Sequence, residues 1–434
     1  MQEERMQPRV HDVVGIGFGP SNLALAVALA EEDERRGADG RPGVDAVFFE
    51  KQPGFGWHRG MLIDGATMQV HFLKDLVSLR NPASRYSFLA YLHARGRLVD
   101  FVNHKTMFPT RVEFHDYLEW TAAAFADRVR YGTEVVALRP RDDEVLEVVV
   151  RRDDRLETHL ARNVVIGVGL EPVLPEGVRA GERVWHTEDL LTRLGEREGW
   201  NPRRVVVVGA GQSAAEAVEY LHRTYPETEV CAVFARYGYS PADDSAFANR
   251  IFDPAAVDHY YAAPDDVKRM LFEYSRNTNY SVVDLDLIDE LYRRAYAEKV
   301  AGAERLRILN ASRVLDVRDD GGAVRVRVGF LPTGEAADLD ADALVYATGY
   351  RERDPFDLLG EAGGDCLAGP DGRPVVERDY RVATAPGRSW GVYLQGATEH
   401  THGIASSLLS MTAVRTGEIV RSIARRSAGV TPAV

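Results

Sequence analysis

The sequence predicts an α/β fold made of two similar units and a helical insertion. Each unit consists of an apolar strand, a glycine-rich turn, a helix and a second strand, and the units start near Asp12 and Arg203. Between residues 245 and 299 the pattern changes to long charged stretches that favour helices. Two copies of one βαβ pattern in 434 residues predict two Rossmann-like domains, each with its own sheet.

The first unit carries its glycines between the strand and the helix. Gly15, Gly17 and Gly19 would let a pyrophosphate approach backbone N–H groups at a helix N-terminus. Pro20 suits the first helical position because its φ is preset. The next strand ends at Glu50, whose carboxylate would bind a ribose 2′-hydroxyl and repel a 2′-phosphate. This unit therefore predicts a site for FAD.

The second unit repeats the pattern but ends differently. Gly209 and Gly211 form the turn, and Ser213 follows them at the start of the helix. The next strand leads to Arg236 instead of an acid, and a guanidinium there could hold a 2′-phosphate, which favours NADPH over NADH. The alternative for Arg236 is a solvated strand-end arginine. A nicotinamide and a flavin in one chain imply hydride transfer to the flavin.

Other segments are expected to complete the two domains. Short strands at 163–168 and 343–346 could each complete a sheet, and a last helix is expected over 406–421. We expect the following division: an FAD-binding domain that starts with 8–200, an NADPH-binding domain over 201–342 with a helical insertion at about 245–300, a return to the FAD-binding domain over 343–425, and a C-terminal tail at 426–434.

The composition excludes several classes of protein. Hydrophobic residues make up 45% and charged residues 27%, which is typical of a globular protein. A net charge of -13 opposes binding to nucleic acid. The longest apolar stretch, 23–30, is too short to span a membrane, and the charged N-terminus lacks the apolar core of a signal peptide. We expect a cytoplasmic protein that binds neither nucleic acid nor a membrane.

Only two cysteines occur, Cys231 and Cys366, and they are far apart in the chain. The absence of a Cys-x-x-Cys motif argues against a dithiol redox centre and against a zinc knuckle. We therefore expect no metal site, and we expect both thiols to be structural.

Separated blocks along the chain resemble one known family. The blocks are Gly17-Phe-Gly-Pro-Ser-Asn22, Trp57-His-Arg-Gly-Met61, Met68 to Pro82, Phe108-Pro-Thr-Arg-Val-Glu-Phe114, Gly209-Ala-Gly-Gln-Ser-Ala214, Thr278-Asn-Tyr-Ser281, Ala347-Thr-Gly-Tyr350 and His402 to Ser410. With these blocks the chain resembles the microbial flavin-dependent N-hydroxylating monooxygenases, the L-ornithine N5- and L-lysine N6-hydroxylases of siderophore biosynthesis.

The resemblance implies a reaction sequence. NADPH reduces FAD, the flavin captures O2 as a C4a-hydroperoxide that retained NADP+ shields, and the side-chain amine of L-ornithine attacks the distal oxygen. The products are N5-hydroxyornithine and water. Because the flavin supplies the chemistry, no side chain is expected to be catalytic. The family resemblance also implies a homo-oligomer, commonly a tetramer.

The resemblance assigns roles to single residues. Lys74 resembles the residue that holds the substrate carboxylate, and Asn249 and Asn279 resemble the amides that fix its α-amino and carboxylate ends, which makes the helical insertion substrate-binding. Ser407, or alternatively Ser410, resembles the polar contact beside the flavin and the side-chain amine. The other residues expected to contact a cofactor are Lys51, Trp57, His58, Met68, Gln69, Arg111, Gln212, Ser213, Arg236, Thr278, Ala347, Thr348, Gly349, Tyr350 and Leu408.

Other interpretations remain open from the residues alone. Lys74 could form a surface ion pair with Asp75, and asparagine is a common turn residue. Lysine or a diamine could replace ornithine, although a diamine would leave Lys74 without a carboxylate partner. A Baeyer-Villiger enzyme would carry Phe-x-Gly-x-x-x-His, whereas the segment 181–186 lacks the phenylalanine. A non-catalytic flavin-binding regulator is the third class.

Overall fold

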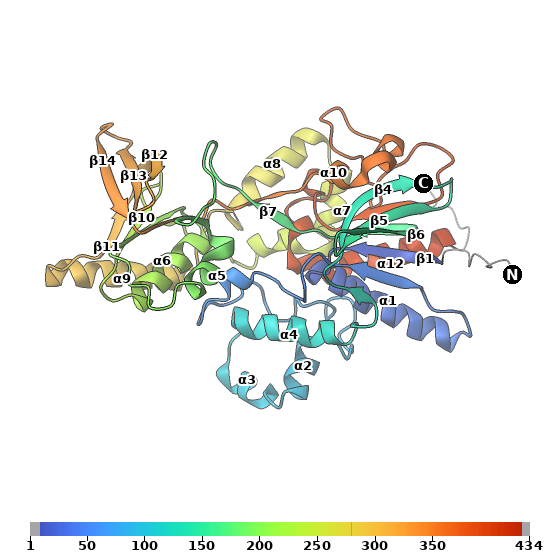
Figure 1. The fold of residues 1–434 in the computed structure, drawn as a ribbon. Helices are drawn as coiled ribbons and strands as arrows, with labels where there is room; N and C mark the ends of the chain where they lie inside the picture. The colour runs from blue at the N-terminus through green and yellow to red at the C-terminus, as the bar shows by residue number, and fades with distance from the viewer. Residues whose placement is uncertain (1–8, 279, 428–434) are drawn as a thin grey trace.

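The computed structural model describes residues 9–278 and 280–427 (Figure 1). The strands of the first large sheet are β1 (Val10–Ile16), β2 (Ala46–Phe49), β3 (Val129–Arg130), β4 (Glu134–Pro140), β5 (Leu146–Arg152), β6 (Arg155–Ile166) and β17 (Gly391–Leu394). Their order is β3-β2-β1-β6-β5-β4, and β17 also pairs with β6. The strands β3, β2, β1, β6 and β17 run parallel to one another. The strand β5 pairs antiparallel with β6, and β4 pairs antiparallel with β5.

Two helices cover one face of this sheet, α1 (Pro20–Ala38) and α12 (Thr412–Ser427). Figure 1 shows them side by side, although they come from opposite ends of the chain. The first half of α1 is fully buried, because it lies between β1 and α12. The N-terminal and C-terminal parts of the chain therefore form one domain.

The second large sheet is entirely parallel. Its strands are β8 (Val184–His186), β9 (Arg204–Val208), β10 (Glu229–Val233), β11 (Leu306–Leu309) and β15 (Ala343–Tyr346), in the order β11-β10-β9-β15-β8. Two helices pack on one face, α6 (Gln212–Thr224) and α9 (Leu285–Ala301). A three-stranded antiparallel sheet covers the other face, with strands β12 (Ser312–Asp319), β13 (Val324–Phe330) and β14 (Ala336–Ala341).

The strand pairing differs from the expected domain boundaries. The boundaries at 200/201 and 342/343 would place β8 and β15 in the first domain, but both strands hydrogen-bond within the second sheet. Their sheet partners lie far away along the chain, so sequence position alone does not assign them. The chain passes between the two sheets through β7 (Leu170–Pro172) and β16 (Tyr350–Glu352), which pair with each other.

Two helical segments differ from their expected form. The insertion expected at about 245–300 consists of α7 (Pro254–Ala262) and α8 (Asp265–Ser275), whereas α9 is the crossover helix between β10 and β11. The last helix begins at Thr412, later than expected, because the extended backbone of Leu408 separates two short 3-10 turns before it. The helix then continues to Ser427, into the segment expected as a tail.

The remaining helices lie around the two sheets. They are α2 (Phe88–Ala94), α3 (Leu98–His104), α4 (Arg111–Ala123), α5 (Leu190–Gly195), α10 (Phe356–Leu359) and α11 (Glu399–His402), with 3-10 turns η1 (Arg59–Met61), η2 (Thr187–Asp189), η3 (Ala248–Phe252), η4 (Arg276–Thr278), η5 (Gly360–Asp365), η6 (Ile404–Ser407) and η7 (Leu409–Met411). Within the described residues, no helix has the length and apolarity needed to cross a membrane. Cys231 and Cys366 are buried free thiols.

Candidate active site between the two sheets

A cleft of about 2000 Å³ lies between the first glycine-rich turn and the start of α6, the helix that follows the second turn. Gly17, Pro20 and Glu50 line it from the first domain, and Gln212 and Ser213 line it from the start of α6. Pockets for small-molecule ligands usually have volumes of roughly 300–1,000 Å³, so this cleft has room for a larger ligand or for more than one. Both domains therefore contribute residues to one cavity.

The first glycine turn fits a diphosphate. Gly17 has a φ of +80°, and a Cβ there would lie 2.6 Å from the carbonyl oxygen of Gly167. The Asn22 side chain donates to the carbonyls of Ile16 and Gly17 and so holds the turn. Behind Gly19, α1 begins without a side-chain cap, so its first N–H groups are free to bind an anion.

Glu50 lies just after β2, at the rim of the cleft. Its two carboxylate oxygens accept hydrogen bonds from the backbone N–H groups of Phe18 and Gln52, at 2.7 and 2.8 Å. These bonds fix the carboxylate beside the glycine turn. Each oxygen keeps a second lone pair, which fits the ribose contact expected there.

The second glycine turn borders a smaller cavity of about 320 Å³. Gly209, Arg236 and Arg313 line it, so two basic residues border the same space. Arg236 donates to the Ser281 carbonyl at 2.8 Å and to the Ser240 hydroxyl at 3.2 Å, which leaves donors on its other nitrogens. Paired guanidiniums beside a glycine turn fit the 2′-phosphate of NADPH.

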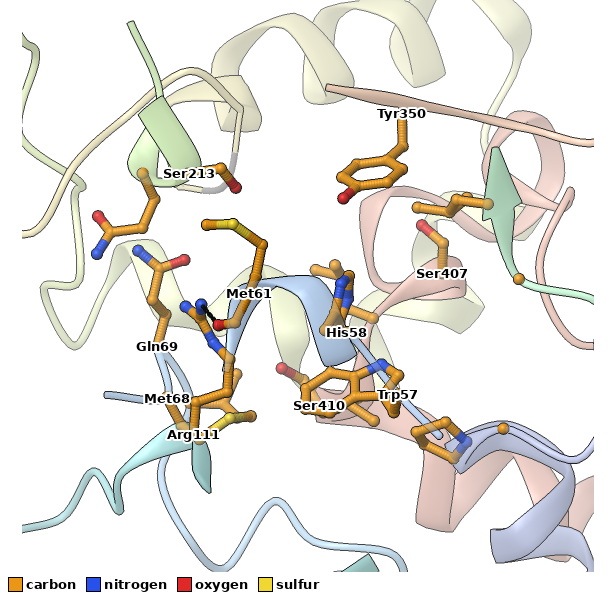
Figure 2. A pocket seen from close by; sticks show the side chains of 18 of the residues that line it. Trp57, His58, Met61, Met68, Gln69, Arg111, Ser213, Tyr350, Ser407 and Ser410 are labelled. Atoms are coloured by element: carbon orange, nitrogen blue, oxygen red, sulfur yellow. Dashed lines mark hydrogen bonds between the residues drawn. The ribbon is translucent and has the colours of Figure 1, made fainter. Parts of the chain in front are cut away.

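Several residues expected to bind a cofactor are held by acids from the second domain. Arg111 forms a bidentate ion pair with the buried Glu216 and donates to the Met61 carbonyl (Figure 2). Gln69 and Gln212 both donate to the carboxylate of Asp284, at 3.2 and 3.0 Å. Arg111 and Gln69 come from the first domain, so these bonds fasten the two domains together across the cleft.

An aromatic and imidazole group forms the wall of the cleft next to η1. His58 lies in the left-handed region with a φ of 48°, and its ring is 4.7 Å from Trp57 and 6.0 Å from Tyr350. Burial, together with the charge of Arg111, lowers the pKa of His58 to about 4. Figure 2 shows His58, Trp57 and Tyr350 around the same space. A neutral imidazole and two flat rings suit the planar ring system of a flavin.

Lys74 faces the cleft opposite the helical insertion. Its ammonium lies 5.1 Å from the centre of the Phe252 ring, and burial lowers the pKa of Lys74 while Asp253 opposes that shift. The alternative ion pair with Asp75 does not form, because the Asp75 carboxylate accepts hydrogen bonds from the Val77, Ser78 and Phe88 N–H groups. Lys74 is therefore available to an anionic ligand.

Asn249 lines the same cleft from η3. Its side-chain amide donates to the Asp244 carbonyl at 2.7 Å and to the Ser245 carbonyl at 3.3 Å, so its amide oxygen can still accept a hydrogen bond. Asn279 lies outside the described residues. Thr278, just before it, lines the cleft and donates its hydroxyl to the Ser275 carbonyl.

Ser407 and Ser410 reach the cleft from the turns before α12. The Ser407 hydroxyl donates to the Glu399 carboxylate at 3.3 Å, and the Tyr280 hydroxyl donates to the same carboxylate. Burial, followed by the charge of nearby Glu399, raises the pKa of Glu352 to about 7. Ser407 thus stands in front of a half-buried acidic pair.

The cleft gathers most of the residues that the sequence predicts, but not all. Lys51, Met68 and Leu408 also line it, whereas five predicted residues line neither cavity: Gly15, Gly211, Ala347, Thr348 and Gly349. The acids Glu216, Asp284, Glu352 and Glu399, and the base Arg313, are absent from the prediction. Each lies outside the glycine motifs, and only the folded chain brings it to the site.

Two Rossmann-like domains that face one cleft define a two-dinucleotide oxidoreductase, as the sequence predicts. The family described as L-lysine 6-monooxygenase/L-ornithine 5-monooxygenase matches residues 9–352. The chain belongs to this family of flavin monooxygenases, so the predicted resemblance is confirmed.

Individual relatives agree with this assignment. The chain is 43% identical to the L-ornithine N(5)-monooxygenase of Burkholderia cepacia, over 95% of this chain and 94% of the relative. The ornithine N-hydroxylase of Kutzneria sp. 744, solved with reduced FAD, NADP+ and L-ornithine, is 49% identical with a TM-score of 0.92, over 96% of this chain and 100% of that one. The L-lysine 6-monooxygenase of Pseudomonas syringae is 32% identical with a TM-score of 0.82, over 96% and 99%.

Proposed function

We propose that this enzyme hydroxylates the side-chain amine of L-ornithine with FAD, NADPH and O2 to give N5-hydroxyornithine. The observation that carries this proposal is the shared cleft: Lys74, Asn249 and Ser407 all line the cavity that the first glycine turn and the start of α6 border. An ammonium and an amide suit the two charged ends of an amino acid. The similarity to ornithine hydroxylases supports the same substrate.

The chain's own residues bind and orient the two cofactors. The first glycine turn and Glu50 hold FAD, and the second turn with Arg236 and Arg313 holds NADPH. Bound FAD supplies the redox and oxygen-transfer chemistry, which no side chain of the site offers. His58 stays neutral at pH 7, so it places no cation on that wall of the cleft.

Ser407 determines where the reacting amine sits. Its hydroxyl donates to Glu399, so its oxygen lone pairs face outward and accept a hydrogen bond from the substrate's terminal nitrogen. Lys74 holds the carboxylate at the other end of the substrate. The length of the side chain between these two contacts decides which amine reaches the reacting position.

A panel of amines tests the proposal. The purified enzyme with FAD, NADPH and O2 is given L-ornithine, L-lysine or putrescine, and hydroxylamine formation is compared with NADPH consumption. We expect L-ornithine to exceed L-lysine in kcat/KM by roughly 10- to 200-fold, the usual cost of one methylene. Putrescine lacks the carboxylate for Lys74 and should be poorer still. NADPH oxidation without any hydroxylamine product would contradict N-hydroxylation. A higher kcat/KM for L-lysine would show that L-lysine, and not L-ornithine, is the substrate.

We also propose a cytoplasmic homo-oligomer, a tetramer in keeping with the family, that serves siderophore or related biosynthesis and binds no nucleic acid. The net charge of -13 supports the last point.

Tyr292, Tyr296 and Val300 form an apolar stripe along α9 and are 75%, 62% and 72% exposed. A subunit contact would cover such a stripe. Light scattering on the purified protein measures the oligomeric state, and a monomer at all concentrations would contradict it.

A further inference from the structure

Arg415, in α12, is one of the most buried side chains of the protein, with 1% of its surface exposed. Its guanidinium donates to the Ser406 carbonyl, to the Thr412 hydroxyl at 3.2 Å, to the Ser21 hydroxyl at 3.3 Å and to the Gln395 side chain at 3.4 Å. All four acceptors are neutral. A buried cation therefore rests on hydrogen bonds alone.

Nothing in the described chain neutralises this charge. The carboxylate whose charge acts on Arg415 is that of Glu418, which is already bound to Arg378 at 2.9 Å. Within residues 9–278 and 280–427, Arg415 forms no salt bridge. Burial lowers the pKa of Arg415, because the charged guanidinium loses its contact with water. Removing an unpaired ion from water is unfavourable, so a buried guanidinium is normally matched by an anion.

Arg415 is connected directly to the first glycine turn. Ser21 and Thr412, two of its acceptors, line the cleft. Gln395 accepts from Arg415 and donates to the Ser21 carbonyl and the Asn22 side chain, and Asn22 in turn holds the turn itself. The guanidinium thus lies behind the N-terminus of α1, where the helix dipole adds further positive charge.

We propose that Arg415 is a positioning residue for FAD, and that the diphosphate of the bound cofactor is the anion that neutralises its charge. The attraction acts across Ser21 and Thr412, whose hydroxyl oxygens accept from Arg415 and whose protons can point to the phosphates. This proposal rests on the assignment of FAD to the first domain. It does not depend on which amine the enzyme hydroxylates.

Two substitutions of similar size separate charge from packing. Arg415→Lys keeps the cation, and Arg415→Gln keeps hydrogen-bond donors but removes the charge. FAD is removed from the full-length holoenzyme, and its rebinding is followed by flavin fluorescence. We expect Arg415→Lys to bind FAD within about threefold of the wild type, and Arg415→Gln to bind it roughly 10- to 100-fold more weakly, as for loss of a charged partner.

Riboflavin, which has no phosphate, gives the discriminating measurement. We expect the two variants to bind riboflavin equally, because the charge acts on the diphosphate only. Equal FAD affinity of the two variants would overturn the proposal, and so would an equal loss of riboflavin and FAD binding in Arg415→Gln. Either result would make Arg415 a packing residue.

Arg381 provides the matched control. It is 5% exposed and donates to the Trp390 carbonyl at 3.0 Å and to the Thr384 hydroxyl at 3.3 Å, and these acceptors line neither cavity, unlike the Ser21 and Thr412 acceptors of Arg415. Arg381→Gln should lower the melting temperature with and without FAD alike, so that the rise in melting temperature on adding FAD is unchanged. In Arg415→Gln that rise should shrink, and an undiminished rise would contradict the proposal. Loss of ornithine hydroxylation in a variant that still binds FAD would concern the proposed reaction instead.

Discussion

At the scale of single residues, Lys74 is available to a ligand because the neighbouring acid does not pair with it. Its neighbour Asp75 accepts three backbone N–H bonds, and the Lys74 ammonium instead lies over the Phe252 ring at the cleft. Replacing it by alanine in Lys74→Ala should raise the KM for L-ornithine roughly 10- to 100-fold, because a charge-assisted contact is lost. Stopped-flow reduction of FAD by NADPH, without ornithine, should be unchanged.

A matched lysine makes this prediction specific. Lys299 is exposed on α9 and does not line the cleft. Lys299→Ala should leave the KM for L-ornithine and the rate of flavin reduction unchanged. A slower flavin reduction in Lys74→Ala would show that the lysine acts on a cofactor.

Arg236 makes a second prediction at the same scale. Its guanidinium shares the smaller cavity with Arg313 beside the second glycine turn. Arg236→Ala should lower kcat/KM for NADPH roughly 10- to 100-fold and leave the value for NADH nearly unchanged, because only NADPH carries a 2′-phosphate. Steady-state rates with both cofactors measure the change. An equal loss with NADH would mean that Arg236 supports the turn through Ser281.

Single residues could be predicted from the sequence only where a local motif marks them. Glu50 and Arg236 each stand at a fixed place after a glycine turn, and Lys74 lies in a family block. Glu216 and Glu399 carry no such mark. They act because the fold buries them against Arg111 and Ser407, and sequence position does not reveal such partners.

At the scale of elements, the first glycine turn depends on its backbone conformation. Gly17 has a φ of +80°, and an alanine Cβ would meet the Gly167 carbonyl oxygen at 2.6 Å. Gly17→Ala should lower the free energy of unfolding by roughly 1–3 kcal/mol from the backbone conformation alone, and displacement of the turn should weaken FAD binding. Urea unfolding and the FAD content of the purified protein measure both effects.

Gly37, at the other end of the same helix, is the control. A Cβ there meets no atom within 4 Å, and its φ is ordinary for a helix. Gly37→Ala should keep full FAD content and leave stability unchanged or slightly raised, since alanine favours helix over glycine by about 1 kcal/mol. Full FAD content in Gly17→Ala would show that the turn tolerates a side chain.

The strands and helices next to the glycine turns could be predicted because their periodicity is local. Assignment of elements to sheets could not, as β15 and α9 show. β15 follows the second sheet's other strands after a long insertion, and α9 resembles α8 before it in its many charged residues. Only its packing against α6 identifies α9 as a crossover helix. These relations depend on contacts between segments far apart in the sequence.

At the scale of the whole molecule, two acidic residues, Glu352 and Glu399, lie near the junction of the two domains and the turns before α12. Glu352 follows Tyr350 on β16, which links the sheets, and Glu399 belongs to α11 just before the Ser407 turn. Tyr280, which follows η4, donates to Glu399. Segments from three parts of the chain therefore share one half-buried pair of carboxyl groups, and the ionisation of this pair affects the stability of the whole fold.

The pH dependence of stability follows from Glu352. Its pKa is raised from 4.5 to about 7 by burial and by the charge of Glu399, so the folded state binds a proton that the unfolded state releases. The destabilisation is therefore absent below about pH 4.5, grows as the pH rises to about 7, and stays constant above, reaching at most about 3 kcal/mol. Glu352→Gln cannot ionise and should escape this loss.

Thermal unfolding of the wild type and Glu352→Gln between pH 5 and pH 8 measures this effect. The melting temperature of Glu352→Gln relative to the wild type should rise across the interval, because only the wild type ionises Glu352 in the fold. Glu335→Gln, at an exposed turn after β13, should show no such trend. A constant difference between Glu352→Gln and the wild type would mean that Glu352 is charged throughout, compensated by a group such as Arg373, which lowers its pKa.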